Sequence, residues 1–172
     1  MTNPEPVVSL FRKAPDAPGN NRQLDRIDRA ILHLLQSDAR LPNKEIARRV
    51  NLSPTPCLRR VKILEETGFI KRYRAVLDPV QLGYSIRAFL GVKRSRDSNR
   101  SSVADEVLKI PEVLACHVVS GEFDLLVEVV ARDMEHYSEV VLEGIAELEC
   151  VLDLRSTFSI KALKTDGALP IR

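Results

Sequence analysis

The chain has 172 residues, of which 44% are hydrophobic and 29% charged, and it carries a net charge of +2. This length allows one domain or two small ones, and the composition is typical of a globular protein. No apolar run approaches the roughly 20 residues that span a bilayer, and the first residues lack a signal-peptide pattern. We therefore expect a cytoplasmic protein that does not contact a membrane. The three cysteines, at positions 57, 116 and 150, are widely spaced and do not cluster with histidines, which disfavours a metal site or a disulfide framework.

The charge is distributed unevenly along the chain. Residues 24–74 carry twelve basic and six acidic side chains, a net charge of +6, whereas residues 75–172 carry eleven basic and sixteen acidic ones, a net charge of −5. A basic segment can neutralise the phosphates of a nucleic acid, and an acidic segment cannot. The distribution predicts two parts with separate roles. Before them, residues 1–23 hold four of the ten prolines and show no apolar periodicity, which predicts a disordered tail.

Two helices are predicted at the start of the basic segment. The first begins at Asp25, whose carboxylate can cap it, and ends near Asp38. Its apolar face repeats at helical spacing and consists of Leu24, Ile27, Ile31, Leu34 and Leu35. The second begins near Pro42, has Ile46, Ala47 and Val50 on its apolar face, and ends at Asn51. Asparagine suits the left-handed conformation that ends a short helix.

A third helix is predicted between Ser53 and Gly68. Ser53 can cap it, and Pro54 and Pro56 then occupy first-turn positions whose N–H groups would have no intrahelical partner. Leu58, Val61 and Leu64 recur every third residue and are expected to face inward. Gly68 is a natural helix end.

The spacing of the second and third helices predicts a helix-turn-helix. About eight residues of helix, a short turn and about fourteen residues of helix are typical of this DNA-binding motif. The start of the third helix would remain exposed, so that Thr55, Arg59 and Arg60 reach the major groove and the free N–H groups of the first turn contact a phosphate. The residues expected at double-stranded DNA are Lys44, Ser53, Pro54, Thr55, Pro56, Arg59, Arg60 and Lys62.

The period changes after Gly68. Residues 69–77 alternate loosely, carry Lys71, Arg72 and Arg74, and are expected to form a wing or a linker strand. From residue 85 the pattern is strand, helix, strand, strand, helix, strand, which predicts a ferredoxin-like antiparallel sheet backed by two helices. The expected α+β protein therefore has a tail (1–23), a winged helix-turn-helix domain (24–74), a linker (75–84) and a ferredoxin-like domain (85–172).

Four motifs, in their order and spacing, resemble the Lrp/AsnC family of leucine-responsive and asparagine regulators. The resemblance covers everything from Leu24 to Arg172. Its strongest stretches are Leu24-Asp25-Arg26-Ile27-Asp28, Asn51-Leu52-Ser53-Pro54-Thr55-Pro56-Cys57-Leu58-Arg59-Arg60-Val61, Leu64-Glu65-x-x-Gly68-Phe69-Ile70 and Val119-Ser120-Gly121-Glu122-Phe123-Asp124.

The resemblance implies a transcriptional regulator with a ligand-sensing second domain. Family members form dimers through their sheets and assemble into tetramers, octamers or larger rings, and a small effector, usually an amino acid, binds between dimers. By this resemblance Asp124 would bind the amino group of the effector and N–H groups near Gly121 its carboxylate. Ser156 would add a hydroxyl, with Ser120 and Glu122 nearby. The ending Ala168–Ile171 is similar to branches that control amino-acid metabolism genes.

Two other functions fit parts of the pattern. An architectural protein that wraps DNA without responding to an effector would share the helix-turn-helix units and the oligomer. A ferredoxin-like domain can also be catalytic, but the sequence has no Gly-rich phosphate loop and no nucleophile–base pair. We therefore expect no catalytic residue, no metal and no cofactor.

Overall fold

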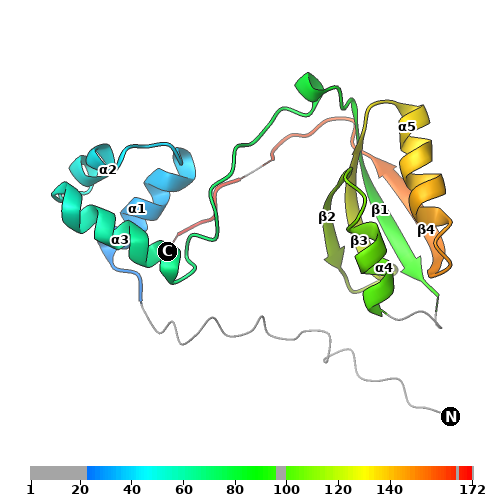
Figure 1. The fold of residues 1–172 in the computed structure, drawn as a ribbon, viewed down its shortest axis with the longest axis horizontal. Helices are drawn as coiled ribbons and strands as arrows, with labels where there is room; N and C mark the ends of the chain where they lie inside the picture. The colour runs from blue at the N-terminus through cyan, green and yellow to red at the C-terminus, as the bar shows by residue number, and fades with distance from the viewer. Residues whose placement is uncertain (1–22, 96–99, 166, 172) are drawn as a thin grey trace, which may run out of the picture. The chain divides into compact units, whose positions relative to one another are not determined.

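The computed structural model of the protein describes residues 23–95, 100–165 and 167–171 (Figure 1). These residues form two compact units, one made by residues 23–75 with 167–171 and the other by residues 76–165. The predicted tail lies outside the described residues, except for Gln23. The predicted second domain was expected to include the C-terminal residues, but residues 167–171 belong to the first unit.

The first unit contains the three predicted helices. They are α1 (Arg26–Ser37), α2 (Asn43–Arg49) and α3 (Pro54–Glu66). Asp25 caps α1 as predicted, because its Oδ1 accepts a hydrogen bond from the N–H of Asp28 at 2.8 Å. Asn51 and Gly68 both have the left-handed backbone that was expected of them, with φ values of 55° and 77°.

The cap of α3 differs from the prediction. Ser53 occupies the N-cap position and Pro54 the first helical position, but the Ser53 hydroxyl makes no capping hydrogen bond. Asn43, at the start of α2, donates from its side-chain nitrogen to the carbonyl of Pro54 at 2.8 Å. This bond joins the beginnings of α2 and α3 directly, so an amide from the other helix helps to hold the turn.

An apolar core holds the three helices together. Its fully or nearly fully buried members are Ile31, Leu32, Ile46, Ala47, Cys57 and Leu64. Burying one large aliphatic side chain contributes about 1.5–3 kcal/mol, so this small set is enough to orient short helices. The prediction that Leu58 faces inward is wrong, since 45% of Leu58 is exposed. The inward face of α3 instead runs through Cys57, Val61 and Leu64.

Residues 69–77 form no strand, so the predicted wing or linker strand is an extended segment without a sheet partner. A short 3₁₀ helix, η2 (Val80–Leu82), follows it.

The second unit has the predicted βαββαβ order. Its elements are β1 (Ile86–Arg94), α4 (Arg100–Val107), β2 (Val113–Val118), β3 (Leu125–Ala131), α5 (Met134–Ser138) with its π-helical continuation η3 (Glu139–Ala146), and β4 (Val151–Phe158). The strands pair antiparallel in the order β2-β3-β1-β4, which is the ferredoxin-like arrangement. The last strand ends at Phe158.

The two helical segments cover one face of this sheet (Figure 1). Leu90, Val92 and Val127 point to that face and pack with Val103, Val107, Tyr137, Val141 and Ile145. Because side chains alternate along a strand, Phe89 and Leu126 point to the other face. Both are more than a third exposed there. The sheet therefore has one face buried under its own helices and one open apolar face.

Candidate DNA-binding and effector sites

The start of α3 is the exposed part of the helix-turn-helix. Ser53, Pro54, Thr55 and Pro56 are all exposed, while Cys57 directly after them is fully buried. Burial raises the pKa of the Cys57 thiol, which suits a packing role rather than a reactive one. The first turn of α3 thus presents the Ser53 and Thr55 side chains outward, although Pro54 and Pro56 carry no N–H group, and the buried Cys57 anchors it.

The two neighbouring arginines of α3 have different surroundings. Arg59 is exposed, and no ion pair holds it among the described residues. Arg60 turns toward α1 and donates from its Nη1 to Oδ2 of Asp25 at 2.6 Å and to Oδ1 of Asp28 at 2.8 Å. The Asp28 side chain is only 1% exposed. Arg60 therefore ties α3 to α1, which does not fit its predicted place in the major groove, whereas Arg59 remains available.

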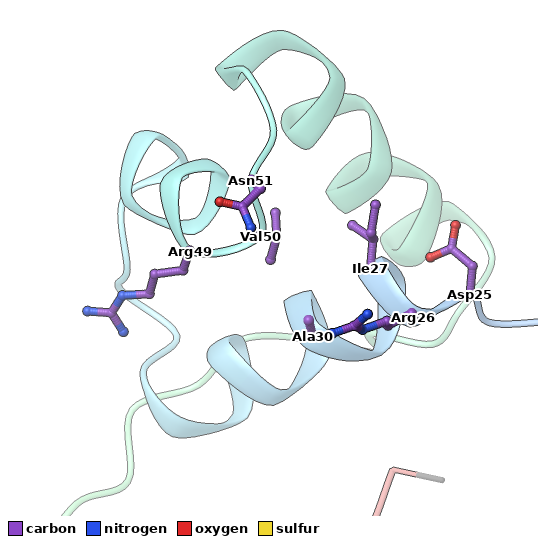
Figure 2. A pocket seen from close by; sticks show the side chains of 7 residues that line it. All are labelled: Asp25, Arg26, Ile27, Ala30, Arg49, Val50 and Asn51. Carbon is purple, nitrogen blue, oxygen red and sulfur yellow. The ribbon is translucent and has the colours of Figure 1, made fainter.

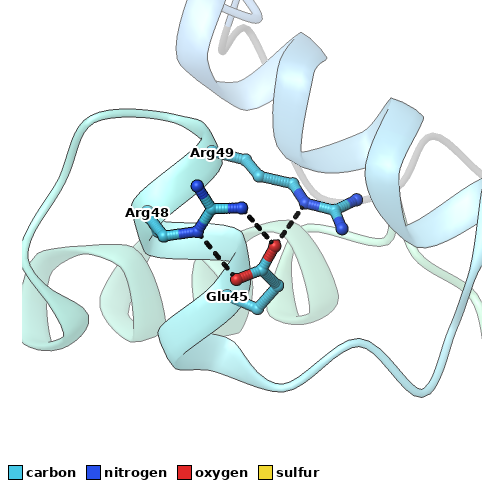
Figure 3. A network of polar contacts seen from close by, with 3 residues as sticks. All are labelled: Glu45, Arg48 and Arg49. Carbon is cyan, nitrogen blue, oxygen red and sulfur yellow. Dashed lines mark hydrogen bonds and ion pairs between the residues drawn. The ribbon is translucent and has the colours of Figure 1, made fainter.

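On α2, the carboxylate of Glu45 pairs with two of the basic side chains, Arg48 and Arg49 (Figure 3). Glu45 accepts hydrogen bonds from Nε and Nη2 of Arg48, at 2.9 and 2.8 Å, and from Nε of Arg49, at 2.7 Å. These are i,i+3 and i,i+4 contacts along one helix, so the sequence alone contains the signal for them. Lys44 and Lys62, the other predicted contacts, are exposed.

This network lowers the pKa of the Glu45 carboxyl group. Hydrogen bonds from Arg48 and then Arg49 lower the pKa of the Glu45 carboxyl to about 2, from an ordinary 4.5. A lowered folded-state pKa stabilises the fold above the ordinary value, and this stabilisation is lost as pH falls toward 2. Side-chain carboxyl NMR should give a midpoint near pH 2, and Arg48→Gln with Arg49→Gln should return it toward 4.5. A midpoint of 4.5 in the unaltered protein would show that the network does not persist in solution.

A cavity of about 530 Å³ opens between the start of α1 and the end of α2 (Figure 2). Arg26, Arg49 and Asp25 line it together with four other residues. Asp25 is already engaged by Arg60 and by the N–H of Asp28. We assign no ligand to this cavity.

The predicted effector loop, residues 120–124, is held against the sheet. Both carboxylate oxygens of Asp124 are contacted by Arg94, one by its backbone N–H and one by its guanidinium, each at 3.0 Å. Glu122 pairs with Arg155 of β4 at 2.7 Å, and the same guanidinium lies 5.6 Å from the centre of the Phe123 ring. Sequence reasoning missed Arg94 and Arg155, because no local pattern connects them to the loop.

Ser156 is separated from this loop within one chain. Its β1 partner is Leu90, which is buried under the helices, and its hydroxyl accepts a hydrogen bond from Tyr137 of α5. Neighbouring Arg155 points to the opposite face, where Glu122 and Phe123 lie. Gly121 has a φ of 126°, a backbone conformation that glycine adopts readily. The structure thus brings Ser120, Gly121, Glu122 and Asp124 together in one loop and places Ser156 on the helix-covered face.

Comparisons with known proteins agree with both units. Residues 24–71 match a family model described as winged helix-turn-helix DNA-binding, and residues 87–169 match one described as the Lrp/AsnC ligand binding domain. The leucine-responsive regulatory protein of Escherichia coli is 39% identical over 153 residues, which cover 88% of this chain and 93% of that protein. The chain belongs to the Lrp/AsnC family of transcriptional regulators.

Solved Lrp/AsnC structures have the same fold. A Neisseria meningitidis transcriptional regulator, crystallised as a complex with L-methionine, is 39% identical and superimposes with a TM-score of 0.83, covering 86% of this chain and 97% of that one. An AsnC family regulator from Agrobacterium tumefaciens is 35% identical, with a TM-score of 0.79 and the same coverage. The predicted fold and family are confirmed, and the protein is a DNA-binding regulator rather than an enzyme.

Two further observations bear on the predicted partners. None of the helices described here is long and apolar enough to cross a membrane. Among the described residues, no three histidine, cysteine, aspartate or glutamate side chains gather as a metal site requires.

Proposed function

We propose that this protein regulates amino-acid metabolism genes by binding DNA sequence-specifically, and that an amino acid changes this binding. The observation that carries the proposal is the exposed first turn of α3 on a unit with a net charge of +6, joined to a sensing unit of net charge −5. The names of two relatives support the effector class, one being leucine-responsive and the other a complex with L-methionine.

At the DNA, we propose that Arg59 and Thr55 read bases and that Lys44, Lys62 and the first-turn residues of α3 contact phosphates, while Arg60 stays bound to α1. Arginine binds guanine through two parallel hydrogen bonds, which is the commonest specific contact in the major groove. Lys44 and Lys62 are exposed and carry single charges suited to phosphates. The Ser53 hydroxyl can donate to a phosphate, and Pro54 and Pro56, which lack an N–H group, would lie beside the DNA backbone.

At the sensing unit, we propose that the carboxylate of Asp124 binds the ammonium group of the effector. Its side chain is 36% exposed. A carboxylate can accept about four hydrogen bonds, and Arg94 donates two to this one. The backbone N–H groups at Ser120 and Gly121 would receive the effector carboxylate, with Glu122 at the rim. Ser156 would join this site only from another copy of the chain, because residues 120–124 of its own chain lie on the opposite face of the sheet.

A thermal-shift screen tests the effector class. L-leucine and L-methionine come first, followed by the other amino acids. A ligand that binds only the folded state stabilises it by about 2.7 kcal/mol at a hundredfold excess over its dissociation constant. No stabilisation by any amino acid, with DNA binding intact, would favour the architectural alternative.

Asp124→Asn should weaken effector binding about ten- to a hundredfold. The substitution preserves size but removes the charge, and hydrogen bonds to charged groups contribute about 1.5–3 kcal/mol. Titration calorimetry with the stabilising amino acid measures the loss. Asp105→Asn, at an exposed position of α4, is the matched control and should bind normally. Equal affinity in the two variants would remove Asp124 from the site.

We also propose that the open sheet face forms a homodimer. Phe89 and Leu126 lie on this face of adjacent strands, diagonal to one another in the register, and a second copy would bury them. Leu126→Asp should convert dimers and larger assemblies of dimers to monomers in sedimentation analysis, because it places a charge in an apolar interface. Leu163→Asp changes a side chain that is 89% exposed and should leave the assembly unchanged. An unchanged assembly in Leu126→Asp would exclude this face.

A further inference from the structure

The C-terminal residues of the chain are clamped by one side chain of the DNA-binding unit. The N–H of Leu169 donates to Oε1 of Gln36 at 2.7 Å, and Nε2 of Gln36 donates to the carbonyl of Leu169 at 3.2 Å. Gln36 lies in the last turn of α1, 133 positions earlier in the sequence. The side-chain amide thus satisfies both backbone groups of one residue, as a neighbouring strand would, and this fixes the register of the segment.

An apolar anchor follows two residues later. Ile171 packs against the core of the three helices, which includes Ile31 and Leu64. The Leu169 side chain is 74% exposed, so the segment lies on the surface of the DNA-binding unit. Only Ile171, at the end of the segment, packs against the core. One polar clamp and one apolar anchor at alternate residues are the features of an extended peptide bound to a groove.

The groove itself is formed by α1 and the extended segment after α3. Leu32 and Leu35 of α1, Phe69 and Ile70, and the C-terminal residues line a common cavity of about 680 Å³. Residues 69–74 have no sheet partner but are fixed to α3. The N–H of Ile70 donates to the carbonyl of Leu64 at 3.0 Å, and the Tyr73 hydroxyl donates to Glu65 at 2.9 Å. The groove wall is therefore held by α3 independently of the C-terminal segment.

We propose that residues 167–171 form a latch that binds this groove and gives the sensing unit a second connection to the DNA-binding unit of the same chain. The chain leaves the DNA-binding unit after residue 75 and returns to it at residue 167, so residues 76–165 are tethered at both ends. Two tethers restrict the orientation of a unit more than one does. In an oligomer, the latch would limit the spacings at which two α3 helices can reach DNA together.

Hydrogen exchange of the full chain tests the latch without reference to DNA. Gln36→Met keeps a helix-forming residue but removes both clamp bonds, and Ile171→Asp removes the anchor. Loss of a net contribution of about 1 kcal/mol should make the Leu169 amide exchange about fivefold faster in Gln36→Met. The matched controls Gln81→Met and Leu163→Asp lie at exposed positions and should exchange as the unaltered protein does. Equal exchange in Gln36→Met and Gln81→Met would overturn the latch.

DNA with altered half-site spacing tests the consequence, which rests on the proposed function. Shifting one half-site by half a helical turn, about 5 base pairs, moves it to the opposite side of the DNA. The unaltered protein should bind the shifted site roughly tenfold or more weakly, whereas Ile171→Asp should discriminate less while binding the best spacing normally. Equal discrimination in Ile171→Asp and Leu163→Asp would overturn the tethering role. Failure of the unaltered protein to bind DNA would instead overturn the proposed function, and hydrogen exchange would still decide the latch.

Discussion

Replacing Arg60 by methionine should lower the stability of the DNA-binding unit by about 2–4 kcal/mol. Removing one partner of a buried ion pair typically costs about 3–5 kcal/mol, because the other charge remains buried. The value expected here is smaller because the Arg60 side chain is 28% exposed, although Asp28 is only 1% exposed. Each kilocalorie lowers the melting temperature of a unit of this size by roughly 4–8 °C, which circular dichroism measures directly.

Arg59→Ala is the matched control for this experiment. Arg59 precedes Arg60 on α3 but is exposed, so its loss should leave the melting temperature nearly unchanged. It should instead weaken specific DNA binding by about 1–3 kcal/mol. The double variant Asp28→Asn with Arg60→Met should recover part of the stability, since no buried charge remains. Equal melting temperatures for Arg59→Ala and Arg60→Met would refute the assignment of Arg60 to the interior.

Gly91→Val should displace the effector loop and destabilise the sensing unit by about 1–3 kcal/mol. A Cβ at Gly91 would lie 2.6 Å from Cδ2 of Phe123, which is closer than two non-bonded carbon atoms approach, so the ring would have to move. Overpacking of this kind costs about 1–3 kcal/mol, although valine itself is favoured in a strand. Because Phe123 lies in the loop between Glu122 and Asp124, its movement should also reduce stabilisation by the effector amino acid. Thermal melts with and without that amino acid measure both effects.

Two companion variants isolate the cause. Phe123→Ala added to Gly91→Val removes the ring that the valine contacts, so stability should partly return. Gly144→Ala introduces a Cβ at an ordinary 3.6 Å from its nearest neighbour, in a helix, and should be neutral or slightly stabilising. If Gly91→Val and Gly144→Ala have the same melting temperature and the same stabilisation by the effector, the Phe123 ring does not cover Gly91 in solution.

Local chemistry predicted the parts of the fold that depend on neighbouring residues. The cap at Asp25 and the positive φ values at Asn51 and Gly68 follow from residue type and spacing. The βαββαβ order followed from changes of period along the chain. Leu58 was placed wrongly because it repeats with Val61 and Leu64 every third residue, whereas the neighbouring Cys57 is the buried position.

Contacts between distant residues were not predictable from local patterns. Arg60 was assigned to DNA because its partner Asp28 lies 32 positions away, where no local pattern connects the two. Asp124 was assigned to an effector because its contact with Arg94 is likewise not visible in the sequence. The binding of Leu169 by Gln36 spans most of the chain. In each case a side chain with an obvious surface role is engaged by a group that only the fold brings near.

A binding competition measures whether the start of α3 reads a DNA sequence. Labelled DNA from upstream of the protein's own gene is titrated with the purified protein, at about 0.15 M salt, against random DNA of equal length, because salt alone changes such affinities. We predict a preference of roughly a thousandfold or more for the upstream DNA. Arg59→Ala should reduce this preference, and the effector amino acid should change it. Equal affinity for the upstream and random DNA would show that α3 does not select a sequence.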